Sequence, residues 1–146
     1  CELNRVDEDG LFYGFPYQHA LNVKDPEYGD LKSGYDYVDP ILELGAHVAP
    51  TGLAFYDGEM FPKKYKNNIF ITLHGSWNRS KKVGYKVIRV VLDSSGDVVD
   101  IKDFISGWLD GETVLGRPAA PLIISDGSLL ISDDKANVIY RITYKQ

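Results

Sequence analysis

The residues best equipped for chemistry lie on one connection, in the stretch 69-IFITLHGSWNRSKK-82. A short apolar run is followed by an imidazole, an indole, an amide and a guanidinium, which belong to His74, Trp77, Asn78 and Arg79. A hairpin needs as few as two turn residues, so this connection is longer and richer in functional groups than the turn requires. The connection is therefore a candidate site rather than a simple turn.

Each side chain of this loop has a functional and a structural interpretation. Arg79 has the fork geometry for a bidentate pair with a carboxylate, or it is a solvated arginine beside Lys81 and Lys82. His74 either contacts an anion or caps loop carbonyls at the end of its strand. Trp77 is predicted to pack and fix the loop, and Asn78 is predicted to serve the turn.

A second candidate is Arg117, in the stretch 114-VLGRPAAP-121. Pro118 biases Arg117 toward an extended backbone, and Gly116 permits another part of the chain to come close. The pattern predicts an arginine held at the entry to a strand and directed at a site. In the alternative interpretation, Arg117 is paired with Asp110 or Glu112.

Three further side chains are weaker candidates. Tyr17 and His19 follow a turn at 13-YGFP-16, where they border a substrate mouth or, for Tyr17, simply pack. His47, in 47-HVAP-50, is a polar contact to a ligand or a buried histidine satisfied by backbone groups.

Several other chemistries have little support. Asp133 and Asp134 are adjacent carboxylates, but calcium wants six to eight oxygens from several elements, so we interpret the pair as a hairpin connection. The sequence contains no phosphate-binding Gly-rich motif, no Gly-x-Ser-x-Gly and no Cys/His spacing for zinc.

Composition sets the outer bounds. The chain has 146 residues, 44% of them apolar, which is enough for one domain with a real core. Its net charge of −5 comes with dispersed acidic residues and no basic stripe, which disfavours a nucleic-acid partner. No apolar run approaches the ~20 residues of a membrane span. The single cysteine, Cys1, cannot form an internal disulfide. The start CELNR, without Met, leads us to expect a processed or truncated product.

Hydrophobic periodicity predicts an all-β fold. The expected strands are short, rich in β-branched and aromatic residues, and bounded by Gly, Asp, Asn or Pro. They cover residues 2–6, 52–56, 68–73, 85–92, 98–104, 121–125, 129–132 and 138–144. A single helical turn is expected at 62–66.

A weak internal repeat favours a β-propeller over a sandwich. Two units begin with Ala-Pro, at residues 49–50 and 120–121, and each continues with a strand, an Asp-Gly turn and a Tyr/Val/Ile/Arg strand. Four-stranded antiparallel units repeated in this way are typical of propeller blades. We expect an incomplete blade with long loops in 1–48, one complete blade in 49–110, and a last blade without its fourth strand in 111–146.

The ordered motifs resemble the C-terminal part of the sorbosone dehydrogenase family, which are soluble quinoprotein sugar dehydrogenases. The most specific segments are HGSWNR at 74–79 and 126-DGSLLISDDKANVIYRITY-144, supported by 2-ELNRV-6, 13-YGFPY-17, 47-HVAPTGLAFYDG-58 and 116-GRP-118. The resemblance implies about half of a six-bladed propeller, pyrroloquinoline quinone (PQQ) with calcium as cofactors, a sugar or sugar aldehyde as substrate, and a periplasmic or extracellular location. The electron acceptor is not implied.

The resemblance also implies roles for individual residues. PQQ carries three carboxylates and an ortho-quinone, so Arg117, His74, Arg79 and His47 are the expected cofactor contacts, and Tyr17 and His19 are expected near the substrate. The family's catalytic histidine and its calcium-binding Gly-Pro carbonyls would precede this chain, so we expect no catalysis by the chain alone. The alternative is a non-catalytic propeller module that binds a glycan or a protein.

Overall fold

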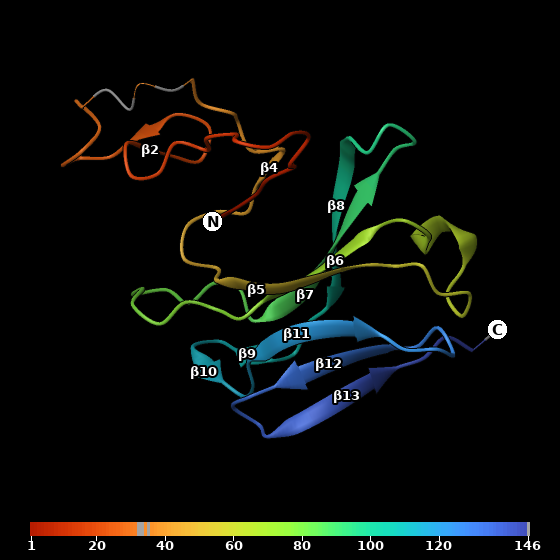
Figure 1. Cartoon of the computed structure of the whole chain (residues 1–146). Helices are drawn as coiled ribbons and strands as arrows, with labels where there is room; N and C mark the ends of the chain where they lie inside the picture. Colours follow the sequence, from red (N-terminus) through yellow and green to blue (C-terminus); the bar gives the residue numbers. More distant parts are fainter. Residues whose placement is uncertain (32–33, 35, 146) are drawn as a thin grey trace. The chain divides into compact units, whose positions relative to one another are not determined.

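The protein folds almost entirely into short antiparallel strands. The computed structural model describes residues 1–31, 34 and 36–145 (Figure 1). Within that range the one helical element is a 3-10 turn, Lys63–Tyr65. The all-β prediction is confirmed, and the helical turn expected at 62–66 is confirmed as that 3-10 turn. The chain forms two compact units, Cys1–Ala46 and His47–Gln146.

The first unit is built from two-residue strands joined by long connections. Strand β1 (Glu2–Leu3) pairs with β4 (Leu42–Glu43), and β2 (Gln18–His19) pairs with β3 (Val23–Lys24). Because these strand pairs are so short, hydrogen bonds to carboxylates also fix the connections between them. The Glu2 side chain accepts a hydrogen bond from the Ala20 N–H at 2.9 Å, and that of Glu43 accepts one from the Leu21 N–H at 3.2 Å.

The second unit begins with a four-stranded meander. Its strands lie in chain order, namely β5 (Pro50–Phe55), β6 (Ile69–Leu73), β7 (Lys86–Leu92) and β8 (Val98–Ile105). Every residue of β6 is buried, which agrees with the apolar run expected at residues 69–73. Because Pro50 is opposite Leu73 and Phe55 is opposite Ile69, the 74–85 connection and the 56–68 connection lie at opposite ends of this sheet.

A three-stranded sheet follows, in the order β11 (Pro118–Ile123), β12 (Leu129–Asp133) and β13 (Val138–Ile142). A short ladder of β9 (Leu109–Asp110) with β10 (Thr113–Val114) precedes it. In Figure 1 the blue sheet lies against the green one, with β11 beside β5.

The two sheets meet through their first strands. A Cβ atom on Gly52 would lie 2.7 Å from Cδ of Pro121 and 3.0 Å from the Ala119 carbonyl oxygen, so only glycine allows β5 and β11 to come this close. The hydroxyls of Thr51 and Thr72 both donate to that carbonyl, at 2.6 and 2.7 Å. Because β5 and β11 belong to different sheets, these two side-chain hydrogen bonds join them in place of a backbone ladder.

An aromatic core fills the space between the sheets. Tyr56 is fully buried, stacks on Phe61 with ring centroids 4.7 Å apart, and donates its hydroxyl hydrogen to the Gly127 carbonyl at 2.8 Å. The same hydroxyl accepts the Phe61 N–H at 2.8 Å. The other buried members of this cluster are Phe70, Tyr85, Val87, Trp108, Leu129 and Ile131.

The strands expected from the sequence are present, with ends that shift by a few residues. The expected 2–6 strand shortens to Glu2–Leu3, and the expected 121–125 strand begins three residues earlier, at Pro118. Five strands of two residues each were not predicted, because a two-residue ladder leaves no hydrophobic period to detect. They are β2, β3, β4, β9 and β10. The division into blades stays a prediction.

Candidate functional site

The connection that carries His74 is fixed where it begins, at the backbone of residues 74–76, which we call the loop base. The His74 N–H donates to the Ala49 carbonyl and the Gly75 N–H to the Val48 carbonyl, both at 2.9 Å. Ser76 is buried; its N–H donates to the Val83 carbonyl at 2.9 Å, and its Oγ accepts the Val83 N–H at 3.1 Å. The two ends of the connection are therefore tied together, and the residues between them form a closed loop.

Glycine makes this base compact. A Cβ atom on Gly75 would lie 2.5 Å from the ring of Tyr85, whose hydroxyl donates to the Ser76 carbonyl. Gly75 also has a φ of +102°, a conformation that other residues avoid. The ring of Tyr85 therefore packs directly on the backbone of the loop.

Arg117 reaches the same loop base from the neighbouring sheet. Its Nε–H donates to the His74 carbonyl at 3.2 Å, and its Nη2–H donates to the Gly75 carbonyl at 2.6 Å. Its Cζ lies 5.7 Å from the centre of the Tyr85 ring, within the range of a cation–π contact. The structure thus gives Arg117 backbone partners rather than the carboxylates of Asp110 or Glu112.

His74 lies beside Arg117. Its Nδ1 is 3.2 Å from the Pro118 carbonyl oxygen, and its Nε2 is 3.6 Å from Oδ2 of Asp134. A carbonyl oxygen only accepts, so Nδ1 carries a hydrogen. The ring's other nitrogen is then a free acceptor when the imidazole is neutral, and a second donor when it is charged.

The structure therefore brings together two of the predicted contacts, His74 and Arg117, and a third segment adjoins them. His47 immediately precedes Val48 and Ala49, which pair with the loop base. It is exposed and has a φ of +65°. The alternative of a buried histidine is wrong for His47, whereas its role as a ligand contact stays a prediction.

Arg79 and Trp77 lie further out on the loop, and both are exposed. The expectation that Trp77 packs is wrong, because 84% of it is exposed to solvent. The tied loop base holds the connection without it, through Ser76 and Tyr85. The role of Arg79 as a cofactor contact stays a prediction.

The sequence indicates only a hairpin connection for Asp133, yet its carboxylate contacts the backbone of Arg117. It is the last residue of β12 and 2% exposed, and its Oδ1 accepts the Arg117 N–H at 2.9 Å. Sequence reasoning missed this contact because the two residues are sixteen positions apart. The available signal was Gly116, a glycine beside an arginine, which indicated a close approach without naming the partner.

The predicted substrate contacts belong to the first unit. His19 lines a cavity of about 540 Å³ together with the aromatic rings of Tyr13 and Phe15 and the carboxylates of Glu2 and Glu43. Its Nε2 lies 2.8 Å from Oδ2 of Asp25.

Hydrogen bonds from the Tyr28 N–H, the His19 ring and the Glu27 N–H hold the pKa of Asp25 below its ordinary value. The carboxylate is therefore charged near neutral pH, and it fixes the imidazole of His19. Tyr17 instead packs edge-on against Phe12, with centroids 6.2 Å apart. This contact agrees with the packing alternative for Tyr17.

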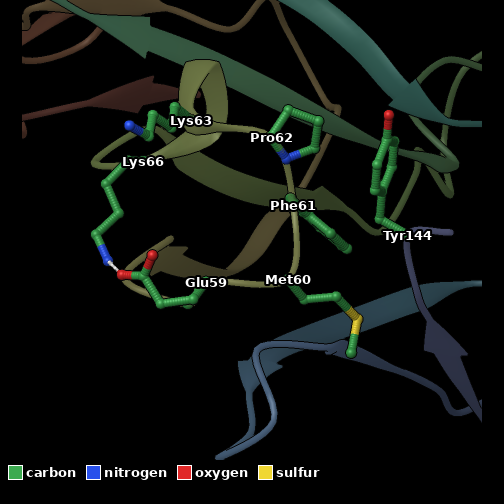
Figure 2. Close-up of a pocket in the computed structure, with 8 residues that line it drawn as sticks. Glu59, Met60, Phe61, Pro62, Lys63, Lys66 and Tyr144 are labelled. Atoms are coloured by element: carbon green, nitrogen blue, oxygen red, sulfur yellow. Dashed lines mark hydrogen bonds and ion pairs between the residues drawn. The ribbon is translucent and has the colours of Figure 1, made fainter. Parts of the chain in front are cut away.

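A separate cavity of about 670 Å³ lies at the 56–68 end of the four-stranded sheet, away from the 74–85 loop (Figure 2). Met60, Phe61, Pro62 and Tyr144 provide its apolar wall. Lys66 lies at its edge, bonded to Glu59. It contains none of the predicted site residues.

Over residues 1–31, 34 and 36–145, no group of three or more His, Cys, Asp or Glu side chains is placed to hold a metal ion. No helix in that part of the chain is long and apolar enough to cross a bilayer.

Comparison with known proteins agrees with the resemblance noted in the sequence. A family model described as TrAA12-like matches residues 6–106, most of the chain. The chain belongs to the TrAA12-like family. One relative, an uncharacterized protein of Borreliella burgdorferi, is 40% identical over 148 residues, covering 99% of this chain and 39% of the relative.

A second relative is a pyrroloquinoline quinone-dependent pyranose dehydrogenase of Coprinopsis cinerea. It is 38% identical over 64 residues, which are 44% of this chain and 8% of that protein. The chain therefore spans about two fifths or less of the length of these relatives. The resemblance to quinoprotein dehydrogenases is confirmed, whereas sorbosone as a substrate is not singled out.

Solved structures share the fold. The Trichoderma reesei carbohydrate-active enzyme of family AA12 has a TM-score of 0.66 at 22% identity, covering 89% of this chain and 38% of that one. The PQQ domain of pyranose dehydrogenase from Coprinopsis cinerea, in its holo form, has a TM-score of 0.64 at 24% identity, covering 92% and 40%. A glucose dehydrogenase has a TM-score of 0.65 at 21% identity, covering 93% and 36%.

Proposed function

We propose that this chain contributes part of the cofactor site of a PQQ-dependent sugar or sugar-aldehyde dehydrogenase. The observation that carries the proposal is the convergence of Arg117 and His74, from two different sheets, on one loop base. A ligand with several carboxylates needs fixed cations and donors, and both side chains are fixed through backbone contacts. The dehydrogenase relatives supply the identity of that ligand.

The donors that Arg117 has left fit a carboxylate. Its contacts to the His74 and Gly75 carbonyls use Nε–H and one Nη2–H, which lie along one edge of the guanidinium. A guanidinium has five N–H groups, so the Nη1–Nη2 edge still offers a parallel pair of donors. Arg117 can therefore hold the loop and bind a carboxylate at the same time, which the sequence interpretation did not anticipate.

When bound, PQQ would accept a hydride from the sugar, while the protein supplies binding and orientation. We assign Arg117 and His74 to the cofactor's carboxylates, and we retain Arg79 and His47 as further contacts. His19 and Tyr17 are proposed to lie near the sugar. Calcium is proposed for the whole protein, with its ligands outside this chain, as the resemblance implies.

The architecture and location are proposed on the same basis. The four-stranded and three-stranded sheets correspond to a complete blade and a blade that lacks its fourth strand, in a propeller of which this chain would form about half. A periplasmic or extracellular location is proposed because the resemblance implies export. With PQQ and calcium added, we expect the chain by itself to reduce no dye with sugar, because the resemblance places the catalytic histidine elsewhere.

The test is a PQQ titration followed by absorbance, with calcium and with a chelator, on the wild-type chain, R117Q and H74Q. Loss of a charge-assisted bidentate contact should weaken binding about 10- to 100-fold in R117Q. R141Q is the matched control, because Arg141 is bonded to Asp126 and Ser128 at the opposite end of the three-stranded sheet from Arg117.

Equal affinity in wild type and R117Q would refute the assignment. Absence of PQQ binding, together with specific binding of a glycan or a protein, would favour the non-catalytic propeller module.

A further inference from the structure

We propose that Asp133 is the positioning residue of this site: its buried carboxylate holds the backbone from which Arg117 reaches the loop. This inference rests on the proposed function for the identity of the ligand. The effect of Asp133 on the position of Arg117 does not depend on a ligand.

The Asp133 carboxylate joins two segments of backbone. Besides the Arg117 N–H, its Oδ1 accepts the N–H groups of Lys135 at 3.1 Å and Ala136 at 2.8 Å. Its Oδ2 accepts the hydroxyl of Tyr140 at 3.2 Å. One side chain therefore fixes both the turn after β12 and the residue just before β11, and four donors compensate its burial.

Gly116 is required by this arrangement. A Cβ atom there would lie 2.2 Å from Oδ2 of Asp133 and 2.4 Å from Cδ1 of Trp108. Its φ is not in the left-handed region, so the backbone conformation does not demand glycine. The absence of a side chain serves the approach of the carboxylate to the segment before Pro118.

Electrostatics keeps the carboxylate charged. Burial raises the pKa of Asp133, but hydrogen bonds from Ala136, Arg117, Tyr140 and Lys135 outweigh it, so the pKa lies below its ordinary value. An ionised carboxylate accepts stronger hydrogen bonds than a neutral amide does. Asp133 should therefore hold the Arg117 backbone more firmly than asparagine would.

The consequence reaches both candidate contacts. Arg117 is held at its backbone by Asp133 and at its guanidinium by the His74 and Gly75 carbonyls. The next residue, Pro118, supplies the carbonyl that orients His74. Loosening the backbone at residues 116–118 should displace the guanidinium and the imidazole together, although Asp133 touches neither.

The first experiment is a double-mutant cycle read by PQQ affinity on the 146-residue chain. D133N should weaken binding about tenfold, since it exchanges charge-assisted hydrogen bonds for neutral ones at a nearly unchanged shape. In the R117Q background the further loss caused by D133N should be clearly smaller, because only the part that passes through Pro118 and His74 remains. An equal loss in both backgrounds would show a general structural effect and overturn the proposal, as would no loss in either.

D126N is the matched control. Asp126 also occupies a turn, where its Oδ1 accepts the Ser128 N–H at 2.8 Å and the Ser128 hydroxyl at 2.6 Å. The hydrogen bonds from Ser128 also lower the pKa of Asp126. Its turn joins β11 to β12 at the opposite end of the sheet from Arg117, so its substitution should leave PQQ affinity within about twofold of wild type. A loss as large as that in D133N would contradict the proposal.

The second experiment needs no ligand, so it separates this inference from the proposed function. Hydrogen exchange of the Arg117 Nε–H, followed by NMR, should be slow in wild type because of its bond to the His74 carbonyl, and at least about tenfold faster in D133N. Y140F, which removes one donor to Oδ2, should give a smaller acceleration. If the chain binds no PQQ but exchange responds in this way, the proposed function fails and the positioning role stands. Unchanged exchange in both variants would overturn the positioning role.

Discussion

At the scale of single residues, the buried charges have unequal environments. Asp133 is surrounded by donors, whereas Arg89 is not. Arg89 is 7% exposed and stacks over Tyr65 at 4.3 Å, but its Nε and Nη1 have no hydrogen-bond partner in the described part of the chain. A satisfied buried charge contributes to stability, and an incompletely satisfied one costs free energy.

The stability that the Asp133 carboxylate contributes should depend on pH. Because its folded-state pKa lies below the ordinary aspartate value of 3.8, the contribution is fully present above that value and is lost as pH falls through the folded-state pKa. D133N should lower the free energy of unfolding by about 1–3 kcal/mol at pH 7, and the difference from wild type should shrink below pH 3.8. Urea unfolding at several pH values measures it. A difference independent of pH would contradict the charge argument.

Arg89→Met should be tolerated or should stabilise the fold. The substitution removes a buried charge with two unpartnered nitrogens and keeps a long side chain over Tyr65, so we expect a change between about 0 and +2 kcal/mol. R89A is the matched comparison, because it removes the packing as well and should destabilise. Thermal unfolding of both variants decides the matter. A loss above about 2 kcal/mol in R89M would mean that the guanidinium has partners, such as ordered water, that stabilise it.

At the scale of elements, the contact between the two sheets is narrow and specific. Gly52 allows β5 and β11 to touch, the threonine hydroxyls bond across, and Tyr56 joins the β5 end of one sheet to Gly127 in the turn of the other. The same contact places the 74–85 loop beside Arg117. Damage here should therefore affect both stability and the site.

Gly52→Val should destabilise the second unit by at least about 1–3 kcal/mol, because its side chain has to displace backbone atoms of β11. Leu53→Val, at the neighbouring half-exposed position, should change stability by less than about 0.5 kcal/mol. Chemical denaturation compares them. Equal free energies of unfolding for the two variants would show that the two sheets can move apart at this contact without loss of stability.

Tyr56→Phe should cost about 1–3 kcal/mol, because it leaves the buried Gly127 carbonyl and the Phe61 N–H without their shared partner. Tyr144→Phe, an exposed tyrosine, serves as the control and should have almost no effect. Thermal unfolding of both variants provides the measurement. A neutral Tyr56→Phe would imply that water replaces the hydroxyl.

At the scale of the whole molecule, apolar side chains remain uncovered on the three-stranded sheet. Leu122 and Ile139 lie on the face opposite the core and are 58% and 68% exposed. The last strand, β13, is also an edge of that sheet. Exposed apolar faces and open strand edges promote association.

We therefore predict that the 146-residue chain self-associates in solution. I139K should raise the monomer fraction, because it places a charge on the uncovered face. S95K, in the exposed turn between β7 and β8, adds the same charge elsewhere and should leave association unchanged. Multi-angle light scattering at several concentrations is the measurement. A wild-type chain that stays monomeric throughout would show that the apolar face does not drive association.

The sequence by itself determined the class of fold and most of its strands. Alternation, apolar runs and turn residues act over a few positions, so the boundaries of β6 and β7 follow from local pattern. Arg117 was found in the same way, because Pro118 restricts its backbone and Gly116 permits a close approach, both from adjoining positions. Motif order, with HGSWNR at its centre, predicted the family to which the chain belongs.

Tertiary structure alone decided what those residues touch. No local signal pairs Asp133 with Arg117, or the Arg117 guanidinium with the carbonyls of His74 and Gly75, because each contact joins parts of the chain distant in sequence. The exposure of Trp77 was mispredicted for the same reason: an aromatic residue in a loop is buried only if another element covers it, and here Ser76 and Tyr85 close the loop without it. Local periodicity fixes which residues form strands, whereas hydrogen-bond partners and exposure depend on the packing of one sheet against another.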